Sequence, residues 1–250
     1  MLNGRRVAVV IPAYNEAPRI GRVLSSMPAY VDDVVVVDDA SEDGTAQAAR
    51  AIDAPRVRVI EHPANRGVGA ALSTGYRVAF EGGADVTAVM AGDGQMHPDD
   101  LEDLLRPVIT GQAEYSKGNR LHHPGVRSHM PPQRWIGNQL LSCATRAVTG
   151  LHITDSQCGY TAISRAAHAT LPWPQVWDGY GYPNDLLGWL SHSGARVHDV
   201  VVRPVYADEV SGIRLRHALL VIPFVLLRVL LRRIRRTPRR DTDSACASGY

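Results

Sequence analysis

Four short apolar runs recur in the first ninety residues, and a stretch with helical spacing follows each of them. The runs are rich in valine and too short for helices, which is typical of strands buried on both faces of a parallel sheet. We predict strands at Val7–Ile11, Val34–Asp39, Val57–His62 and Asp85–Met90. We predict helices at Ala17–Met27, Gly44–Ile52, Val68–Phe80 and Pro98–Ile109. This alternation predicts an open α/β sheet with flanking helices and right-handed crossovers.

The pattern is looser from Ala113 onward. It predicts a strand over residues 113–117, a loop at His122–Pro132, helices at Arg134–Val148 and Asp185–Ser193, and a last strand over residues 196–206. No linker composition separates the two halves. We therefore expect one catalytic domain over residues 1–213.

The C-terminal segment has a different character. Its apolar stretch of about 14 residues contains Pro223 and Arg228, whereas a spanning helix needs about 20 predominantly apolar residues. Nine arginines and no acidic residue lie between Arg214 and Arg240. This pattern predicts an amphipathic helix over residues 214–240 that lies on an anionic membrane surface, and docking on the protein's own core is the alternative. Residues 241–250 are small and polar, and we expect a disordered tail.

Charge and composition narrow the classes of protein. The chain has 250 residues, of which 45% are hydrophobic, and this excludes a disordered chain. Residues 1–213 hold 18 Lys and Arg against 23 Asp and Glu, and such an acidic body argues against a nucleic-acid partner. Three cysteines without a CxxC pair favour a reducing compartment. The first apolar run stops at Pro12, too early for a signal peptide, so we expect a cytoplasmic protein, peripheral or monotopic on the membrane.

Polar turns follow each of the first four predicted strands. Carboxyl ends of parallel strands meet at one edge of a sheet, so these turns are expected to form one pocket. Tyr14 can stack on a base, Asp39 can accept hydrogen bonds from a base, and Asp93 can bind a cation that carries a diphosphate. Gly67 permits close approach of the backbone to a ligand. The turns are Pro12–Glu16, Asp38–Ser41, Asn65–Gly67 and Gly92–Gln95.

Six segments resemble, in order and spacing, the family 2 glycosyltransferases of the GT-A fold. They are IPAYNE, VVDDASEDGT, NRGVGAALSTG, AGDGQMHP, GNR and DSQCGY. Within this family the chain resembles the polyprenyl-phosphate branch, similar to dolichol-phosphate mannose synthases, over residues 6–206. The resemblance implies a Rossmann-like, mostly parallel sheet. It also implies inverting transfer of a sugar from a GDP- or UDP-linked donor to a polyprenyl or dolichyl phosphate, with Mg²⁺ or Mn²⁺.

The resemblance assigns roles to individual residues. Asp93 and Gln95 match the end of a DxDxQ metal motif, whose first aspartate is Ala91 here. Because Mg²⁺ needs only one or two carboxylates, we expect weaker metal binding rather than none. Asp155 and Gln157 are assigned to the donor sugar, with stabilisation of its own turn as the alternative for Asp155. Arg120, Arg134 and Asn138 are assigned to the acceptor phosphate. Four residues are assigned to the nucleotide-sugar: Pro12, Tyr14, Glu16 and Asp39. The polar turns described above add Asp38, Asn65, Gly67 and Asp93 to the residues that bind the nucleotide-sugar.

Asp185 separates two mechanisms. A phosphomonoester has a second pKa of about 6 and is largely a dianion at neutral pH, so it needs no general base. A hydroxyl acceptor needs one, and Asp185 resembles the second acid of the ED motif in relatives that use hydroxyl acceptors. We therefore count Asp93, Arg120, Arg134 and Asp185 as candidate catalytic residues.

Three alternatives stay open beside this interpretation. The first is a soluble glycosyltransferase that acts on a hydroxyl of a small molecule or glycan, with Asp185 as base. The second is a non-catalytic protein that binds a nucleotide-sugar. An NAD-dependent dehydrogenase is the third and is disfavoured, because RGVGAA follows the third strand and lacks the last glycine of the dinucleotide-binding motif.

Overall fold

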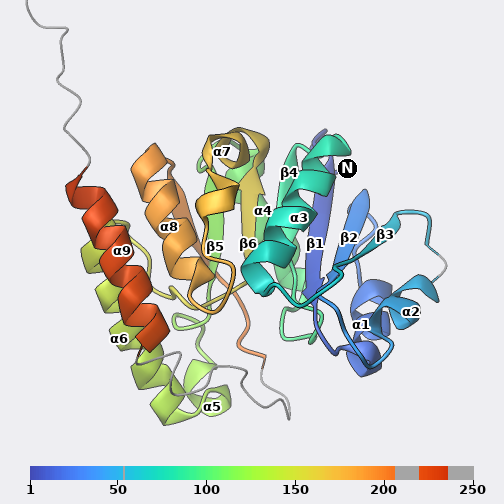
Figure 1. Ribbon diagram of the computed structural model, residues 1–250, viewed down its shortest axis with the longest axis horizontal. Helices are drawn as coiled ribbons and strands as arrows, with labels where there is room; N and C mark the ends of the chain where they lie inside the picture. The colour runs from blue at the N-terminus through green and yellow to red at the C-terminus, as the bar shows by residue number, and fades with distance from the viewer. Residues whose placement is uncertain (53, 206–219, 236–250) are drawn as a thin grey trace, which may run out of the picture.

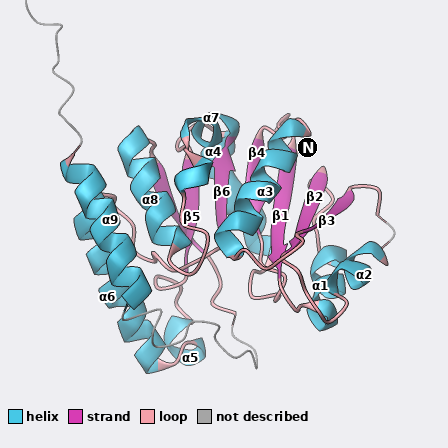
Figure 2. Ribbon diagram, in the orientation of Figure 1, coloured by secondary structure: helices cyan, strands magenta, loops and turns pink. Residues whose placement is uncertain are grey.

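The computed structural model describes residues 1–52, 54–205 and 220–235, and these form a seven-stranded sheet between helices. Figure 2 shows the strands as one central layer with helices on both sides. The order across the sheet is β3-β2-β1-β4-β6-β5-β7. The strands are β1 (Val7–Ala13), β2 (Asp33–Asp38), β3 (Val57–Glu61), β4 (Val86–Val89), β5 (Tyr115–Asn119), β6 (Thr161–Ser164) and β7 (Val197–Val201).

The sheet is mostly parallel, as the sequence predicts. β1 pairs in parallel with β2 and β4, β2 pairs in parallel with β3, and β5 pairs in parallel with β7. β6 runs antiparallel to both β4 and β5. This strand is absent from the sequence prediction, because its residues, Thr161–Ser164, form no apolar run.

Each face of the sheet buries one set of side chains from the same strands. In β1, Val7, Val9 and Ile11 belong to one core cluster, and Ala8 and Val10 belong to the other, as the two-residue period of a strand requires. The first cluster is covered by α1 (Ala17–Ser25), α2 (Thr45–Arg50) and α4 (Leu101–Ile109), the last preceded by a 3-10 turn, η1 (Pro98–Asp100). The second is covered by α3 (Val68–Glu81), α7 (Arg165–Thr170) and α8 (Tyr182–Ser193) (Figure 1).

Two further helices lie at one side of this sandwich. Figure 1 shows α6 (Pro132–Thr149) and α9 (Ile222–Ile234) beside α8. α9 buries Ile222, Val225 and Val229. Within the described ranges no helix is both long and apolar enough to cross a bilayer. Residues 214–219 and 236–240 of the predicted membrane segment, and the whole predicted tail 241–250, lie outside the described residues.

Short helices occur where the sequence predicts loops or gives no prediction. α5 (Val126–His129) lies within the predicted loop His122–Pro132, and the 3-10 turn η2 (Trp173–Gln175) precedes α8. α5 has four residues and α7 has six. Each therefore has fewer than two helical turns, which is too short for a clear amphipathic repeat in the sequence.

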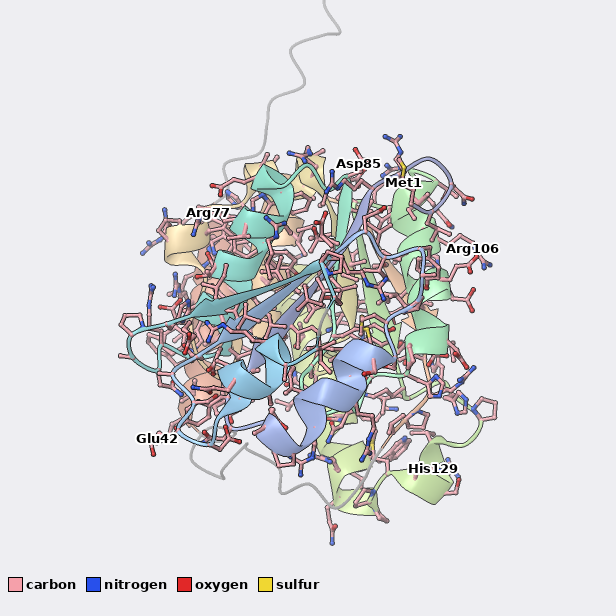
Figure 3. The ribbon with its side chains drawn as sticks, turned by 90° about the vertical axis from the view of Figure 1, so that its right-hand side faces the viewer. Met1, Glu42, Arg77, Asp85, Arg106 and His129 are labelled. Atoms are coloured by element: carbon pink, nitrogen blue, oxygen red, sulfur yellow. The ribbon has the colours of Figure 1, made fainter. Side chains whose placement is uncertain are left out.

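The loops that follow the parallel strands gather at one end of the molecule. In Figure 3, Glu42 after β2 and His129 after β5 lie toward the lower end, whereas Met1 and Asp85, which precede β1 and β4, lie near the upper end. The polar turns therefore share one edge of the sheet.

Candidate active site

The turns after β1 and β2 are joined by direct hydrogen bonds. The Asn15 amide donates to Ser41 Oγ at 2.8 Å, and the Glu42 amide donates to Asn15 Oδ1 at 3.0 Å. The Glu16 amide donates to Thr45 Oγ1 at 2.8 Å. Asn15 has φ +57°, a left-handed conformation that asparagine tolerates better than most residues. The two turns therefore form one rigid wall.

Two predicted nucleotide residues of this wall differ in exposure. Tyr14 is 48% exposed, so its ring is accessible for stacking. Asp38 is buried, and its Oδ1 accepts a hydrogen bond from the Ser41 amide at 3.1 Å. Pro12 lies within β1, opposite Val37 of β2. Asp38 therefore stabilises the turn after β2 from within the protein, and Pro12 belongs to the sheet itself.

Asp39 holds the glycine turn that follows β3. Its Oδ2 accepts from the Gly67 amide at 2.7 Å, and its Oδ1 accepts from the Arg66 amide at 3.0 Å. His62 Nδ1 lies 2.7 Å from the same Oδ1, and His62 Nε2 lies 3.0 Å from Thr74 Oγ1. The structure thus places Asp39 at the predicted edge, where it organises the turn. A contact to the base stays a prediction.

His62 is a member of this cluster that the sequence analysis missed. It follows β3 directly, and its side chain is 6% exposed. A single histidine after a strand matches no sequence motif, so only its contact with Asp39 in the structure reveals that it belongs to the cluster.

A second loop covers the glycine turn. Gly67 has φ +92°, and a Cβ there would lie 2.6 Å from the Asp178 carbonyl oxygen. A Cβ on Gly69 would lie 2.3 Å from the Trp177 carbonyl oxygen. Both distances are far below van der Waals contact, so only glycine fits. Asn65, also predicted to bind the donor, is exposed on the same turn.

The turn after β4 lies against the end of β1. A Cβ on Gly92 would lie 3.4 Å from Ala13 Cβ and from Glu16 Cγ, so Glu16 lies beside the start of the turn that carries the predicted metal residues. The Gln95 amide donates to Asp93 Oδ1 at 2.9 Å. In the part of the chain that the structure describes, no three His, Cys, Asp or Glu side chains form a metal cluster. One carboxylate and one amide fit a cation whose other ligands are diphosphate oxygens and water.

Arg120 follows β5 and is fixed by a carboxylate. Its Nε donates to Asp155 Oδ2 at 2.8 Å and its Nη2 to Asp155 Oδ1 at 3.0 Å. Burial would raise the pKa of Asp155, but the Arg120 guanidinium and Lys117 outweigh it and hold that pKa below its usual range. Asp155 is 0% exposed. Its contacts are those of an anchor for Arg120, and a contact with the donor sugar stays a prediction.

Gln157 belongs to the same turn. Its amide donates to Asp155 Oδ1 at 3.2 Å, and its Nε2 donates to Ser156 Oγ at 2.8 Å and to Asn184 Oδ1 at 3.2 Å. These bonds join the turn to α8. A contact between Gln157 and the donor sugar remains a prediction.

Arg134 and Asn138 lie one helical turn apart on α6 and so share a face. Asn138 Nδ2 lies 3.8 Å from Met130 Sδ. A small apolar cluster of Leu121, Val126 and Met130, against which Trp135 packs, ties the loop after Arg120 to the start of α6. The predicted acceptor residues are thus held on one connected segment.

Asp185 has a different environment from the other candidates. It is 0% exposed, its Oδ2 accepts from the Trp177 amide at 3.0 Å, and its Oδ1 accepts from Arg232 Nη2 at 3.0 Å. A general base needs an oxygen directed at the acceptor hydroxyl, and both oxygens here bind protein donors. These contacts are those of a residue that positions α9 and the loop before α8, so they do not support the base assignment.

The sequence model of glycosyl transferase family 2 matches residues 8–171. The chain belongs to this family. A UDP-N-acetylglucosamine–dolichyl-phosphate N-acetylglucosaminyltransferase from Methanococcus voltae is 34% identical over 217 residues, which cover 81% of this chain and 86% of the relative. An undecaprenyl-phosphate mannosyltransferase from Micrococcus luteus is 33% identical, with 83% and 88% covered.

A solved structure of another protein shares the fold of this family 2 glycosyltransferase. Glucosyl-3-phosphoglycerate synthase from Mycobacterium tuberculosis, in a complex with Mn²⁺, UDP and glucosyl-3-phosphoglycerate, superposes with a TM-score of 0.69 at 24% identity. The match covers 91% of this chain and 80% of that one. The predicted GT-A fold, the resemblance to the polyprenyl-phosphate branch and the glycosyltransferase activity are confirmed, and the dehydrogenase alternative is excluded.

Proposed function

We propose that this glycosyltransferase moves a sugar from a GDP- or UDP-linked donor to a polyprenyl or dolichyl phosphate, with inversion at the anomeric carbon. The observation that carries the proposal is Arg120, held in a fixed plane by buried Asp155 at the same edge of the sheet as the turns of Asp39 and Asp93. The acceptors in the names of the Methanococcus and Micrococcus relatives support it.

The acceptor end of the site needs positively charged side chains rather than a general base. A phosphomonoester is already nucleophilic as a dianion, so the protein's task is to hold it in line behind the anomeric carbon. Arginine suits this task because its planar guanidinium binds phosphate oxygens in pairs. We assign Arg120 and Arg134 to that role and Asn138 to a supporting hydrogen bond.

The donor end uses the turns after β1 to β4. Tyr14 stacks on the base, and the glycine turn held by Asp39 lies close to the sugar nucleotide. Asp93 and Gln95 are the residues that would hold Mg²⁺ or Mn²⁺, which supplies charge stabilisation for the departing nucleoside diphosphate. With Ala91 in place of a second carboxylate, metal affinity is expected to be low.

The alternative of a hydroxyl acceptor requires Asp185 as base. Asp185 is buried and its two oxygens accept from the Trp177 amide and Arg232, so that mechanism would require the acceptor hydroxyl to reach a buried carboxylate oxygen that already has a protein donor. The lipid-phosphate acceptor requires no such approach and is favoured for this reason.

We also infer that α9 contacts an anionic membrane on the cytoplasmic side. Phe224, Leu227, Leu231 and Ile234 are 43–69% exposed and share the side of α9 that is turned away from buried Ile222, Val225 and Val229. A groove of about 430 Å³ runs between α8 and α9. Its wall combines three of these apolar side chains with arginines, and it is lined by Gln175, Trp189, His192, Phe224, Leu227, Arg228, Leu231, Arg232 and Arg235. Apolar side chains with arginines at their border suit lipid tails and headgroups.

The proposed reaction is tested with a panel of radiolabelled GDP- and UDP-sugars, with polyprenyl phosphate as acceptor and Mg²⁺ or Mn²⁺ present. Label is expected in the organic phase with one donor, and only when lipid phosphate is added. Transfer to a water-soluble hydroxyl acceptor, with none to the lipid, would support the Asp185 mechanism instead.

A further inference from the structure

The C-terminal helix α9 is fixed to α8 by close packing and by ion pairs of buried Asp185 with Arg232 at 3.0 Å and Arg228 at 4.0 Å. A Cβ on Gly188 would lie 2.7 Å from both methyl carbons of Val229, so the two helices touch there. Arg232 Nη2 donates to Asp185 Oδ1 at 3.0 Å, and its guanidinium carbon lies 3.6 Å from the centre of the Trp189 ring. Asp185 is fully buried and the Arg232 side chain is 12% exposed, so water competes little for this pair.

The same carboxylate also holds the loop before α8. Asp185 Oδ2 accepts from the Trp177 amide at 3.0 Å. The Trp177 and Phe224 rings lie 5.8 Å apart, and Arg228 Nη2 donates to the Gln175 carbonyl at 2.5 Å. Gln175 and Trp177 therefore contact α9 directly at two points, and Asp185 of α8 holds the Trp177 amide.

The next residues of this loop lie directly on the glycine turn of the donor site. The Gly69 amide donates to the Asp178 carbonyl at 2.6 Å. Gly69 is the second residue of α3, and the first amides of a helix have no acceptor within the helix. The Asp178 carbonyl supplies that acceptor, so the position of the loop sets that of the turn.

We propose that Arg232 and Asp185 are positioning residues that connect α9 to the donor site. Docking of α9 holds the Asp185 carboxylate, the carboxylate holds the Trp177 amide, and the carbonyl of the next residue, Asp178, holds the turn at Gly67–Gly69. Only the last step, from the turn to donor affinity, rests on the proposed function. The helix that we assign to the membrane thereby influences nucleotide-sugar binding from the far side of α8.

Hydrogen–deuterium exchange of the full-length protein tests the physical connection without any ligand. Arg232→Gln is expected to accelerate exchange at least tenfold in peptides over residues 66–70 and 176–181, and to leave strands β1 and β4 unchanged. Arg233→Gln is the matched control: Arg233 also fastens α9, but its Nη1 donates to the Ala147 carbonyl at 2.9 Å, at the end of α6. It should leave residues 66–70 protected.

The double variant Asp185→Asn/Arg232→Gln leaves no buried charge unpaired and keeps the test valid if Arg232→Gln folds poorly. It should show the same local acceleration. Unchanged exchange at residues 66–70 in both variants, or an increase spread over the whole sheet, would overturn the proposal.

Kinetics separate positioning from general destabilisation. With the donor identified by the panel, Arg232→Gln should raise the donor KM about tenfold and change kcat less than threefold, and Arg232→Lys should recover part of the loss. A fall in kcat alone, with the donor KM unchanged, contradicts the proposed connection. If the panel yields no transfer, the hydrogen–deuterium exchange data still test whether α9 positions the turn at Gly67–Gly69. Failure of the proposed reaction and failure of this structural connection are therefore distinguishable.

Discussion

Arg120 and Asp155 form a two-point ion pair, with Nε–Oδ2 and Nη2–Oδ1 distances of 2.8 and 3.0 Å. The carboxylate is fully buried and the arginine side chain is 19% exposed. A guanidinium fixed in this way keeps its plane, which would reduce the entropy lost on binding an anion in the role that we propose.

Arg120→Lys should therefore lower kcat for transfer to polyprenyl phosphate by about 100-fold, since an ammonium cannot keep the paired geometry. It should also lower the free energy of unfolding by about 1–3 kcal/mol, because Asp155 loses a buried partner. Arg196→Lys is the control: Arg196 pairs with Glu114 but is 61% exposed, so stability and activity should hardly change. Equal effects of the two variants would contradict the role of Arg120.

Asp93→Ala should abolish metal-dependent transfer, because it removes the carboxylate of the Asp93–Gln95 turn. The measurement is transfer rate against Mg²⁺ and Mn²⁺ concentration, with Glu102→Gln, an exposed change on α4, as control. A metal dependence that survives in Asp93→Ala would show that the cation binds elsewhere.

The exposed face of α9 predicts where membrane affinity resides. Leu227→Gln/Leu231→Gln should weaken binding to anionic liposomes at least tenfold, since losing a buried leucine contact costs about 1.5–3 kcal/mol and 1.4 kcal/mol is about tenfold. Leu140→Gln changes a leucine of α6 that is 67% exposed and serves as control. Sedimentation with liposomes measures binding, and undiminished binding of the double variant would remove the membrane assignment of this face.

His168 predicts a pH dependence of stability. Partial burial, with a smaller effect of Arg165, lowers the pKa of His168 to about 4, against about 6.5 in an unfolded chain. Between these two pH values the unfolded chain binds more protons than the folded one. The contribution of His168 to the free energy of unfolding is therefore fully present above about pH 6.5, and it falls as the pH drops toward 4, by at most about 1.4 kcal/mol per pH unit.

Replacement of His168 by phenylalanine removes this titration while keeping an aromatic ring beside Phe80 and Trp173, whose ring centres lie 4.5 and 5.0 Å from that of His168. Melting temperatures of the two proteins between pH 4.5 and 7 test the assignment. The change of melting temperature with pH should be smaller in His168→Phe, and the same change in both proteins would refute the role of His168.

The alternation of apolar runs and helical stretches was sufficient to predict β1 to β4, α1 to α4 and the edge of the sheet where the polar turns meet. These features depend on periodicity and on the right-handed crossover rule, which act over some thirty residues of chain. β6 contains no apolar run, and α5 and α7 have fewer than two helical turns, so the antiparallel strand and the small helices escaped prediction.

The sequence by itself determined the family, the fold class and which residue types stand at the strand ends. Only the tertiary structure decided what those residues touch: that Asp39 holds the glycine turn with His62, that Asp155 anchors Arg120, and that Asp185 binds Arg232 of α9. The physical reason is that a carboxylate's role depends on the donors that reach it in space. These donors come from residues 23 to 47 positions away along the chain, and no local pattern records them.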